Sequence, residues 1–467
     1  MSSRLKRRAA AIACSVFMLT LADVEAFAAS ERGHESVDST AAGVSWSATP
    51  NQLTLPGALE LAKRIHPDLR VAEANLAVAR ADSLFAKVPP FNPEVEIRTS
   101  RGGRSLGSGA ESALELGVSQ ELELWGKRDA RRRLATARSR TVAVERDATM
   151  QDIESEIRAR FERALYLQDR LATLGELTDL DRRVVLASQA RVRDGSITPL
   201  TGRLTELDLL RLEAQGRRTF AEHRQALVAL GLAIGRQFPE SLRLNGELDA
   251  DSLRAPEDSV VALAFRVRAE GEVLRRRIVE RRAELHLAQR EARPNLTLGV
   301  GLARERTSLT GDDFFGDPAI VGGIAGARDT DNLWTAHVSA PLPLWQKNQR
   351  GRAVASAEIA RSLADYDRYR LRTELAAVAA ARRFQDAARL YQLYLQRSAR
   401  VRQDLGLVRE AYADGRISLE SYLTQKGRLV DTLIGQLEAA DAYWEARGTL
   451  EAAVGLDLAT LNSRGGR

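Results

Sequence analysis

Side chains suited to metal or acid–base chemistry are scattered along this sequence of 467 residues. The histidines show no ligand spacing, and no cysteine or carboxylate joins them in the pattern of a zinc or copper site. They are His34, His66, His223, His286 and His337. The sequence also has no Ser/His/Asp arrangement with supporting context, no phosphate-binding glycine loop and no paired catalytic carboxylates. We therefore expect neither an enzyme nor a bound metal or cofactor.

Acidic side chains gather in one long stretch that is rich in glycine, residues 305–332. They are Asp312, Asp313, Asp317, Asp329 and Asp331. Carboxylate oxygens are ligands that calcium prefers. We favour a solvated surface loop here, with a calcium site as the alternative.

Two short segments carry a clearer pattern, residues 114–124 (LELGVSQELEL) and 334–344 (WTAHVSAPLPL). Apolar residues occupy alternate positions in both. This period of two predicts a β-strand with one apolar and one polar face. Each segment is about as long as a strand that crosses a bilayer in a barrel.

Both strands continue directly into a tryptophan and basic residues. The first copy contains Trp125, Lys127 and Arg128, and the second contains Trp345 and Lys347, 220 positions later. Val95 and Ile97 precede the first segment and Leu296, Leu298, Val300 and Leu302 precede the second. We therefore predict two β-hairpins, at 94–124 and 295–344.

Long helices must connect and position these hairpins. Residues 127–194 contain no proline and a single glycine, and their apolar residues are spaced by three or four, which predicts a helix of roughly 100 Å. The turns at 194–199 (DGSITP) and 414–418 (DGRIS) reverse the chain, again at an offset of 220. They predict two long helical hairpins, at 127–235 and 352–458.

The same order of predicted elements therefore occurs twice in the chain, which defines the domain organisation. The first repeat is predicted at 53–248 and the second at 249–467, each with a leading helix, a β-hairpin and a helical hairpin. Residues before the strands match at an offset of 202 (Pro93 with Asn295), and residues after them match at 220. An insertion of 18 residues in the second hairpin loop accounts for the difference.

The N-terminus has the pattern of a secretory signal. Basic residues precede an apolar run, and Ala26-Phe27-Ala28 supplies a cleavage pattern, so we predict a signal peptide at 1–28 and a flexible lead-in at 29–52. Cys14, the only cysteine, lies inside this signal. With 69 basic and 63 acidic residues, the charge is too mixed to indicate a nucleic-acid partner.

Four strands per chain cannot close a barrel, and an open edge inside a membrane leaves backbone groups unpaired. Several chains must therefore pool their strands. A homotrimer with twelve strands satisfies the even, antiparallel rule and leaves room for a lumen.

In these features the chain resembles the TolC-type outer membrane efflux family. The segments VSQELELWGKR, DGSITPL and DGRISLESYL are most similar to its CzcC-like branch. The resemblance implies a mainly α fold with a small β part: a trimeric channel with a barrel in the outer membrane of a Gram-negative bacterium and a helical tunnel in the periplasm. It also implies a periplasmic adaptor and an inner-membrane pump of the resistance-nodulation-division type as partners.

The resemblance assigns roles to both ends of the helices. Tips of the helical hairpins form the closing aperture and the adaptor contact in this family, so the expected tip residues are Asp194, Gly195, Ser196, Asp414, Gly415, Arg416 and Glu420. Solvated turns without a gating role are the alternative. Tryptophan prefers membrane interfaces, so Trp125 and Trp345 are expected at the membrane boundary, with Lys127, Arg128 and Lys347 facing lipid phosphates; capping of the helix core is the alternative for the tryptophans.

Divalent heavy-metal cations are the cargo suggested by the CzcC-like similarity, while drug efflux and type I secretion channels share the same architecture. A periplasmic coiled-coil scaffold with exposed β-hairpins is the competing hypothesis. It explains the helices but leaves the two-faced strands and their tryptophans without a purpose.

Overall fold

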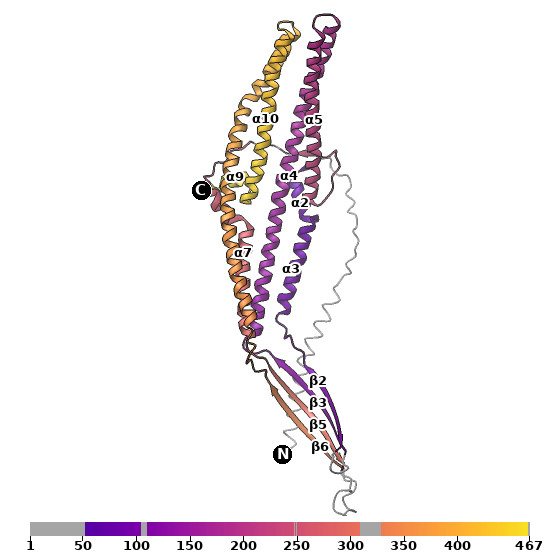
Figure 1. Cartoon of the computed structure of the whole chain (residues 1–467), viewed down its shortest axis with the longest axis vertical. Helices are drawn as coiled ribbons and strands as arrows, with labels where there is room; N and C mark the ends of the chain where they lie inside the picture. Colours follow the sequence, from indigo (N-terminus) through magenta and orange to yellow (C-terminus); the bar gives the residue numbers. More distant parts are fainter. Residues whose placement is uncertain (1–51, 104–109, 247, 249, 309–327, 466–467) are drawn as a thin grey trace, which may run out of the picture. The chain divides into compact units, whose positions relative to one another are not determined.

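The computed structural model describes residues 52–103, 110–246, 248, 250–308 and 328–465. The predicted signal peptide lies outside these ranges, as do residues 29–51 of the predicted lead-in and Asp312, Asp313 and Asp317 of the acidic stretch. Four long helices form two helical hairpins (Figure 1). They are α4 (Lys127–Arg193), α5 (Pro199–Ile234), α9 (Gln349–Ala413) and α10 (Leu419–Val454).

Shorter helices precede the strands in each repeat. They are α2 (Leu55–Ile65), α3 (Pro67–Phe85), α6 (Glu257–Val267) and α7 (Ala269–Glu291), and α11 (Leu458–Gly465) follows α10. Helix α4 packs against α5, α3, α7 and α10, while α9 packs against α10, α7 and α6. The described helices therefore form one layer in which α3 and α5 lie at one edge and α9 at the other.

The helix ends repeat with the predicted offset of 220. Thr198 and Ser418 accept hydrogen bonds from the backbone N–H groups of Thr201 and Ser421 and so cap α5 and α10. Gly235 and Gly455 end the same helices in the left-handed conformation. Equivalent capping residues thus give α5 and α10 the same length of 36 residues.

Four strands form an antiparallel sheet in the order β2-β3-β5-β6. They are β2 (Glu94–Gly103), β3 (Ala110–Leu122), β5 (Leu296–Ser308) and β6 (Arg328–Ser339). Strands β3 and β5 join the two repeats at the centre, so β2 and β6 are open edges. A separate two-stranded parallel sheet pairs β1 (Gln52–Thr54) with β4 (Arg243–Asn245).

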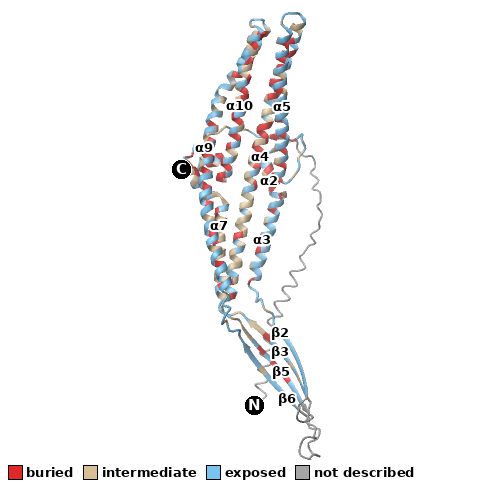
Figure 2. Cartoon of the chain, viewed as in Figure 1, coloured by how far each residue is buried: buried red, intermediate tan, exposed pale blue. Residues whose placement is uncertain are grey.

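The hydrophobic core lies between the helices, whereas the sheet is mostly exposed (Figure 2). One large cluster contains Phe384, Tyr443 and Trp444, and their rings contact one another. A second contains Ile157, Phe161 and other apolar residues of the first repeat. The described part of the chain contains no helix that is both long and apolar enough to span a membrane.

The predicted fold class is confirmed, but two details of the strands differ. Strand β6 ends at Ser339, before the expected Leu344, because Pro341 and Pro343 cannot donate to the sheet. The expected offset of 202 holds for the helices α3 and α7, but Val95 and Leu298 occupy equivalent sheet positions, which is an offset of 203. A shift of one residue in the alignment matters because it moves each side chain of the strand to the other face of the sheet.

Candidate functional site: a two-faced sheet and paired helical tips

One face of the four-stranded sheet is apolar and exposed. Cross-strand register aligns Val95, Val118, Val300 and Ala336 in one row, and the next row contains Ile97, Leu116, Leu302 and Trp334. Val95 is 71% exposed, Ile97 68% and Trp334 75%. A contiguous apolar patch of this kind on a chain indicates a lipid or protein partner.

The opposite face is polar and rich in carboxylates. Its described charged residues are Glu94, Glu96, Arg98, Glu115, Glu121, Glu305 and Asp331. The single arginine is neutralised there, since Arg98 lies 3.3 Å from Glu115 and 3.5 Å from Glu96. A shallow hollow of about 290 Å³ between Glu96, Glu115, Thr335 and His337 lies on this face.

The junction between sheet and helices holds Trp125 in a specific position. Its indole Nε1 donates to the carbonyl of Pro294 over 3.1 Å, and the guanidinium of Arg293 lies 5.3 Å from the ring centroid. The backbone of Trp125 is left-handed, with φ of 64°, and Gly126 follows with φ of 73°. This sharp turn converts the strand direction into that of α4.

Trp345, the equivalent residue of the second repeat, is 82% exposed. Lys347 beside it is also exposed, and its backbone N–H donates to Gln349. Arg128 is exposed and donates to the carbonyl of Lys87. The two predicted interface tryptophans therefore differ in their packing within one chain.

Lys127 differs from expectation because its side chain is buried rather than turned outward. It is 8% exposed, and its ammonium donates to Asn295 over 2.6 Å. Asn295 in turn donates to Glu121 over 2.6 Å. These three residues link the first repeat to the start of β5. The periodicity of the strands did not predict this polar connection.

The tips of both helical hairpins adopt the same turn. The Gly195 N–H donates to Val192 and the Ser196 N–H donates to Arg191, which is the Schellman pattern that ends a helix on a left-handed residue. Gly415 and Arg416 repeat this geometry with Tyr412 and Ala411. The φ angles of Gly195 and Gly415 are 71° and 72°.

Charged tip residues are exposed. Asp414 forms an ion pair of 3.0 Å with Arg416 in the same turn. Glu420 lies in the first turn of α10, where the helix dipole favours a negative charge. Asp194 and Ser196 are exposed at the other tip.

The two tips also contact each other through residues that sequence reasoning did not single out. The guanidinium of Arg191 lies 4.2 Å from the ring centroid of Tyr412, and that ring stacks on Tyr422 at 4.7 Å. Val184 and Ile197 of the first hairpin join the same apolar cluster. The tips of one chain are thus packed together.

A buried ion pair joins the helical hairpins deeper in the bundle. The ammonium of Lys426 on α10 lies 2.9 Å from Asp181 on α4 and 3.3 Å from Asp208 on α5. The side chains of Lys426 and Asp181 are each 3% exposed. Burial raises the pKa of Asp181, and the nearby ammonium opposes that shift.

A second buried polar group lies between α4 and the end of α10. Arg447 pairs with Glu162 at 3.4 Å and with Glu451 at 3.1 Å. Burial and the nearby Glu451 raise the pKa of Glu162 to about 7, although Arg447 and Arg158 oppose this.

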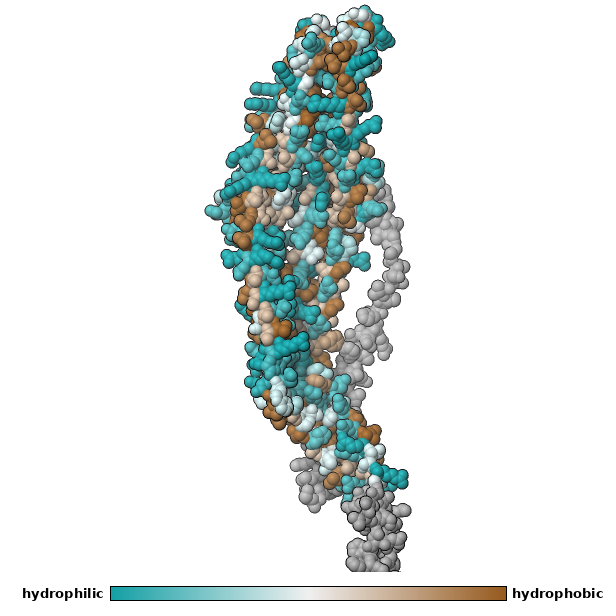
Figure 3. All heavy atoms as spheres, viewed as in Figure 1, coloured by the Kyte–Doolittle hydropathy of each residue, from teal (hydrophilic) through white to brown (hydrophobic). Residues whose placement is uncertain are grey.

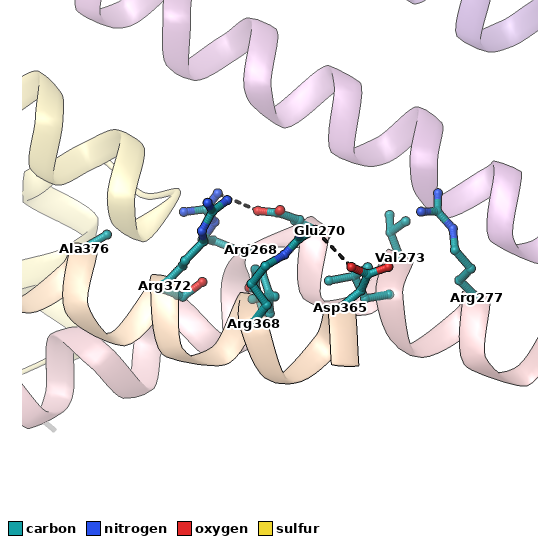
Figure 4. Close-up of a pocket in the computed structure, with 11 residues that line it drawn as sticks. Arg268, Glu270, Val273, Arg277, Asp365, Arg368, Arg372 and Ala376 are labelled. Atoms are coloured by element: carbon teal, nitrogen blue, oxygen red, sulfur yellow. Dashed lines mark hydrogen bonds and ion pairs between the residues drawn. The ribbon is translucent and has the colours of Figure 1, made fainter. Parts of the chain in front are cut away.

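Arginines line a hollow at the surface between α7 and α9, with a volume of about 540 Å³ (Figure 4). Arg268 pairs there with Glu270 at 2.8 Å, and Arg368 pairs with Asp365 at 3.0 Å. Glu270 and Asp365 thus neutralise two of the four arginines in the lining. Over the residues described, no group of three or more His, Asp or Glu side chains is arranged to hold a metal ion.

Comparisons with known proteins identify both the sequence and the fold. The sequence profile of the family described as "Outer membrane efflux protein" matches residues 58–236. No curated protein sequence gives a significant match.

Several solved structures share the fold over most of the chain. A structure of CusC, titled for its transmembrane channel formation, has a TM-score of 0.65 and 15% identity, covering 86% of this chain and 92% of that one. The outer membrane channel CmeC of Campylobacter jejuni has a TM-score of 0.64 and 14% identity, covering 88% and 89%. The outer membrane channel MtrE of Neisseria gonorrhoeae, in its open state, has a TM-score of 0.62 and 17% identity, covering 86% and 89%.

CmeC and MtrE are described as outer membrane channels. Residues 58–236 thus match the profile of the outer membrane efflux proteins, and the fold of the chain is that of TolC-like channels.

Proposed function

We propose that this chain is the outer membrane exit duct of a tripartite efflux system. Three copies would pool their strands into a barrel of twelve in the outer membrane of a Gram-negative bacterium, and the helices would line a tunnel in the periplasm. A periplasmic adaptor and an inner-membrane pump of the resistance-nodulation-division type would complete the system.

The observation that carries this proposal is the four-stranded sheet. It exposes an apolar face, a carboxylate-rich face and two open edges within one chain. A barrel closed by three chains removes the edges, turns the apolar face to lipid and encloses the polar face around water. A periplasmic scaffold would leave Val95, Ile97 and Trp334 in water without a partner.

The helices support the same assembly. Large apolar side chains reach the surface along the edge helices, as the space-filling view illustrates on one face (Figure 3). On α5, Leu207 is 59% and Leu210 60% exposed, and on α9, Leu371 and Leu375 are each 60% exposed. Contact between the α5 edge of one copy and the α9 edge of the next would bury both rows.

Cations are the cargo class that the polar face favours. Six described carboxylates against one arginine line the surface that would face the lumen, and a water-filled pore lined by one sign of charge concentrates the opposite ion. This supports divalent heavy-metal cations over drugs or secreted proteins. The pump would select the ion, so the channel needs no fixed metal site.

Reconstitution tests the duct and its charge preference together. We expect heat-modifiable trimers in the outer membrane fraction and cation-selective conductance in planar bilayers. Val118→Arg, in the middle of the apolar rows, should abolish membrane assembly, because an arginine at mid-bilayer depth in a barrel costs about 2–4 kcal/mol per copy. Thr335→Arg on the polar face is the matched control and should still assemble; a soluble monomeric wild-type chain would refute the proposal.

The tips provide a separate test of gating. If Asp414 and Glu420 help to hold the periplasmic end shut, Asp414→Ala and Glu420→Ala should each raise the resting conductance. Asp431→Ala, at an exposed position further along α10, serves as the control. Unchanged conductance in both tip variants would remove these residues from the gate and leave the duct proposal intact.

A further inference from the structure

The apolar face of the sheet becomes basic toward its loop end. Arg101 on β2 and Arg304 and Arg306 on β5 share the face that carries Val95, Leu116 and Val300. All three arginines are exposed. Among the residues whose side chains the structure describes, this face carries no carboxylate.

Cross-strand register brings the three arginines together. Ser112 on β3 pairs with Arg101 on one side and Arg306 on the other, so all three residues lie in one row. Arg304 lies two positions from Arg306 on the same strand, about 7 Å along it. Three guanidinium groups therefore surround Ser112 and Leu114 on one side of the sheet.

These arginines differ from Arg98 in their ionic contacts with the described residues. None of the three forms an ion pair with any residue that the structure describes, whereas Arg98, on the other face, pairs with two glutamates. Like charges this close repel one another unless an anion lies between them. The described part of the chain therefore supplies no counter-charge to these three arginines.

We propose that Arg101, Arg304 and Arg306 bind the phosphate groups of phosphorylated glycolipid in the outer leaflet. This inference rests on the proposed function, since it requires the apolar face to lie in the membrane. The apolar rows end at Leu302 and Trp334, and Arg304 follows within two residues, at the depth where lipid headgroups begin. Guanidinium matches phosphate geometry with paired hydrogen bonds, and the aliphatic stem of arginine can cover adjacent apolar surface.

Binding of labelled lipid A to the purified trimer in detergent tests the proposal directly. The triple variant Arg101→Gln/Arg304→Gln/Arg306→Gln should bind about a hundredfold more weakly than the wild type, since each basic side chain near an anionic lipid surface contributes about fivefold. Arg98→Gln is the matched control and should bind as the wild type does. Lysine at all three positions should retain most of the affinity.

A comparison of ligands needs no variant and separates the possible anions. The wild-type trimer should bind bisphosphorylated lipid A, bind its dephosphorylated form much more weakly, and ignore millimolar inorganic phosphate as a competitor. Equal binding of phosphorylated and dephosphorylated lipid A would overturn the inference, as would equal losses in the triple variant and Arg98→Gln. A trimer that conducts ions but shows either result would refute only this inference, whereas a chain that forms no trimer would refute the proposed function.

Discussion

At the residue scale, the helical bundle buries charge in two places. Lys426 with Asp181 joins the two helical hairpins near the tips, and Arg447 with Glu162 and Glu451 joins α4 to the end of α10. Ion pairs buried this deeply contribute little net stability but are costly to break on one side. Both groups couple helices of different repeats, so their charge state affects how the two repeats hold together.

Glu162 makes the stability of the bundle depend on pH. Its pKa is about 7 in the folded chain and 4.5 in the unfolded chain, so the folded state retains a proton that the unfolded state has lost between these values. Stability should therefore fall as pH rises from about 4.5 to 7, by about 3 kcal/mol at most. In the Glu162→Gln variant, the stability measured by thermal unfolding should no longer fall as pH rises through this range.

Glu156→Gln provides the control for that measurement, because Glu156 is exposed on the same helix. Its unfolding temperature should follow the pH dependence of the wild type. A Glu162→Gln variant that retained the full slope would contradict the assignment.

Lys426 can be tested by a double-mutant cycle. Lys426→Met alone should cost about 3–5 kcal/mol, because it leaves the buried Asp181 carboxylate without a partner. Lys426→Met/Asp181→Leu should recover most of this loss in thermal unfolding followed by circular dichroism. Additive losses in the double variant would show that the pair does not act as a unit.

At the element scale, sequence periodicity predicted the helices better than the strand ends. Spacing of three or four placed α4 within one residue of its observed end at Arg193, since nothing in the segment opposes a helix. Strand faces depend on register, and here the offset of 202 failed by one residue in β5 relative to β2. Register is decided by pairing with other strands, which a single segment does not encode.

The candidate site residues divide in the same way: local sequence predicts some of them, and packing between distant segments determines the others. The tip turns were predictable because DG at a helix end demands a left-handed residue. Burial of Lys127 and Lys426 was not predictable, because their partners Asn295 and Asp181 lie far away in the chain. Only the packing of one repeat on the other brings these side chains together.

The tip turns should be sensitive to loss of glycine. Gly415→Ala should destabilise the second hairpin by about 1–2 kcal/mol, since an L-residue is strained at a φ of 72°. Gly406→Ala, within α9 and with open space around its Cα, should instead stabilise by up to about 1 kcal/mol. Hydrogen exchange at the tip would report both effects, and equal protection in the two variants would contradict the prediction.

At the scale of the whole molecule, the pairing of β3 with β5 provides a template for contact between subunits. Val118 lies opposite Val300 within the chain. The equivalent edge residues are Val338 and Ile97, so Val338 of one subunit should lie opposite Ile97 of the partner subunit. Within one chain these residues are on strands three spacings apart, about 14 Å, which is too far for a disulfide.

Paired cysteines test this register. Ile97→Cys/Val338→Cys should form disulfide-linked dimers and trimers on oxidation in the outer membrane, seen as a ladder on a non-reducing gel. Ile97→Cys/Trp334→Cys displaces one thiol by four residues along the edge strand and should crosslink poorly. Equal crosslinking of both pairs, or none, would reject the inferred seam.

The central β3–β5 seam has a consequence for how this architecture can be built. Within the chain, this seam joins the second strand of the first repeat to the first strand of the second repeat. In the proposed trimer, the seams between subunits would join the same two strands without a peptide connection. A ring of three duplicated chains is therefore equivalent to a pseudo-hexamer of half-length units. Splitting the gene between its two halves should yield fragments that reassemble into the same pore, with covalent linkage serving to fix the stoichiometry.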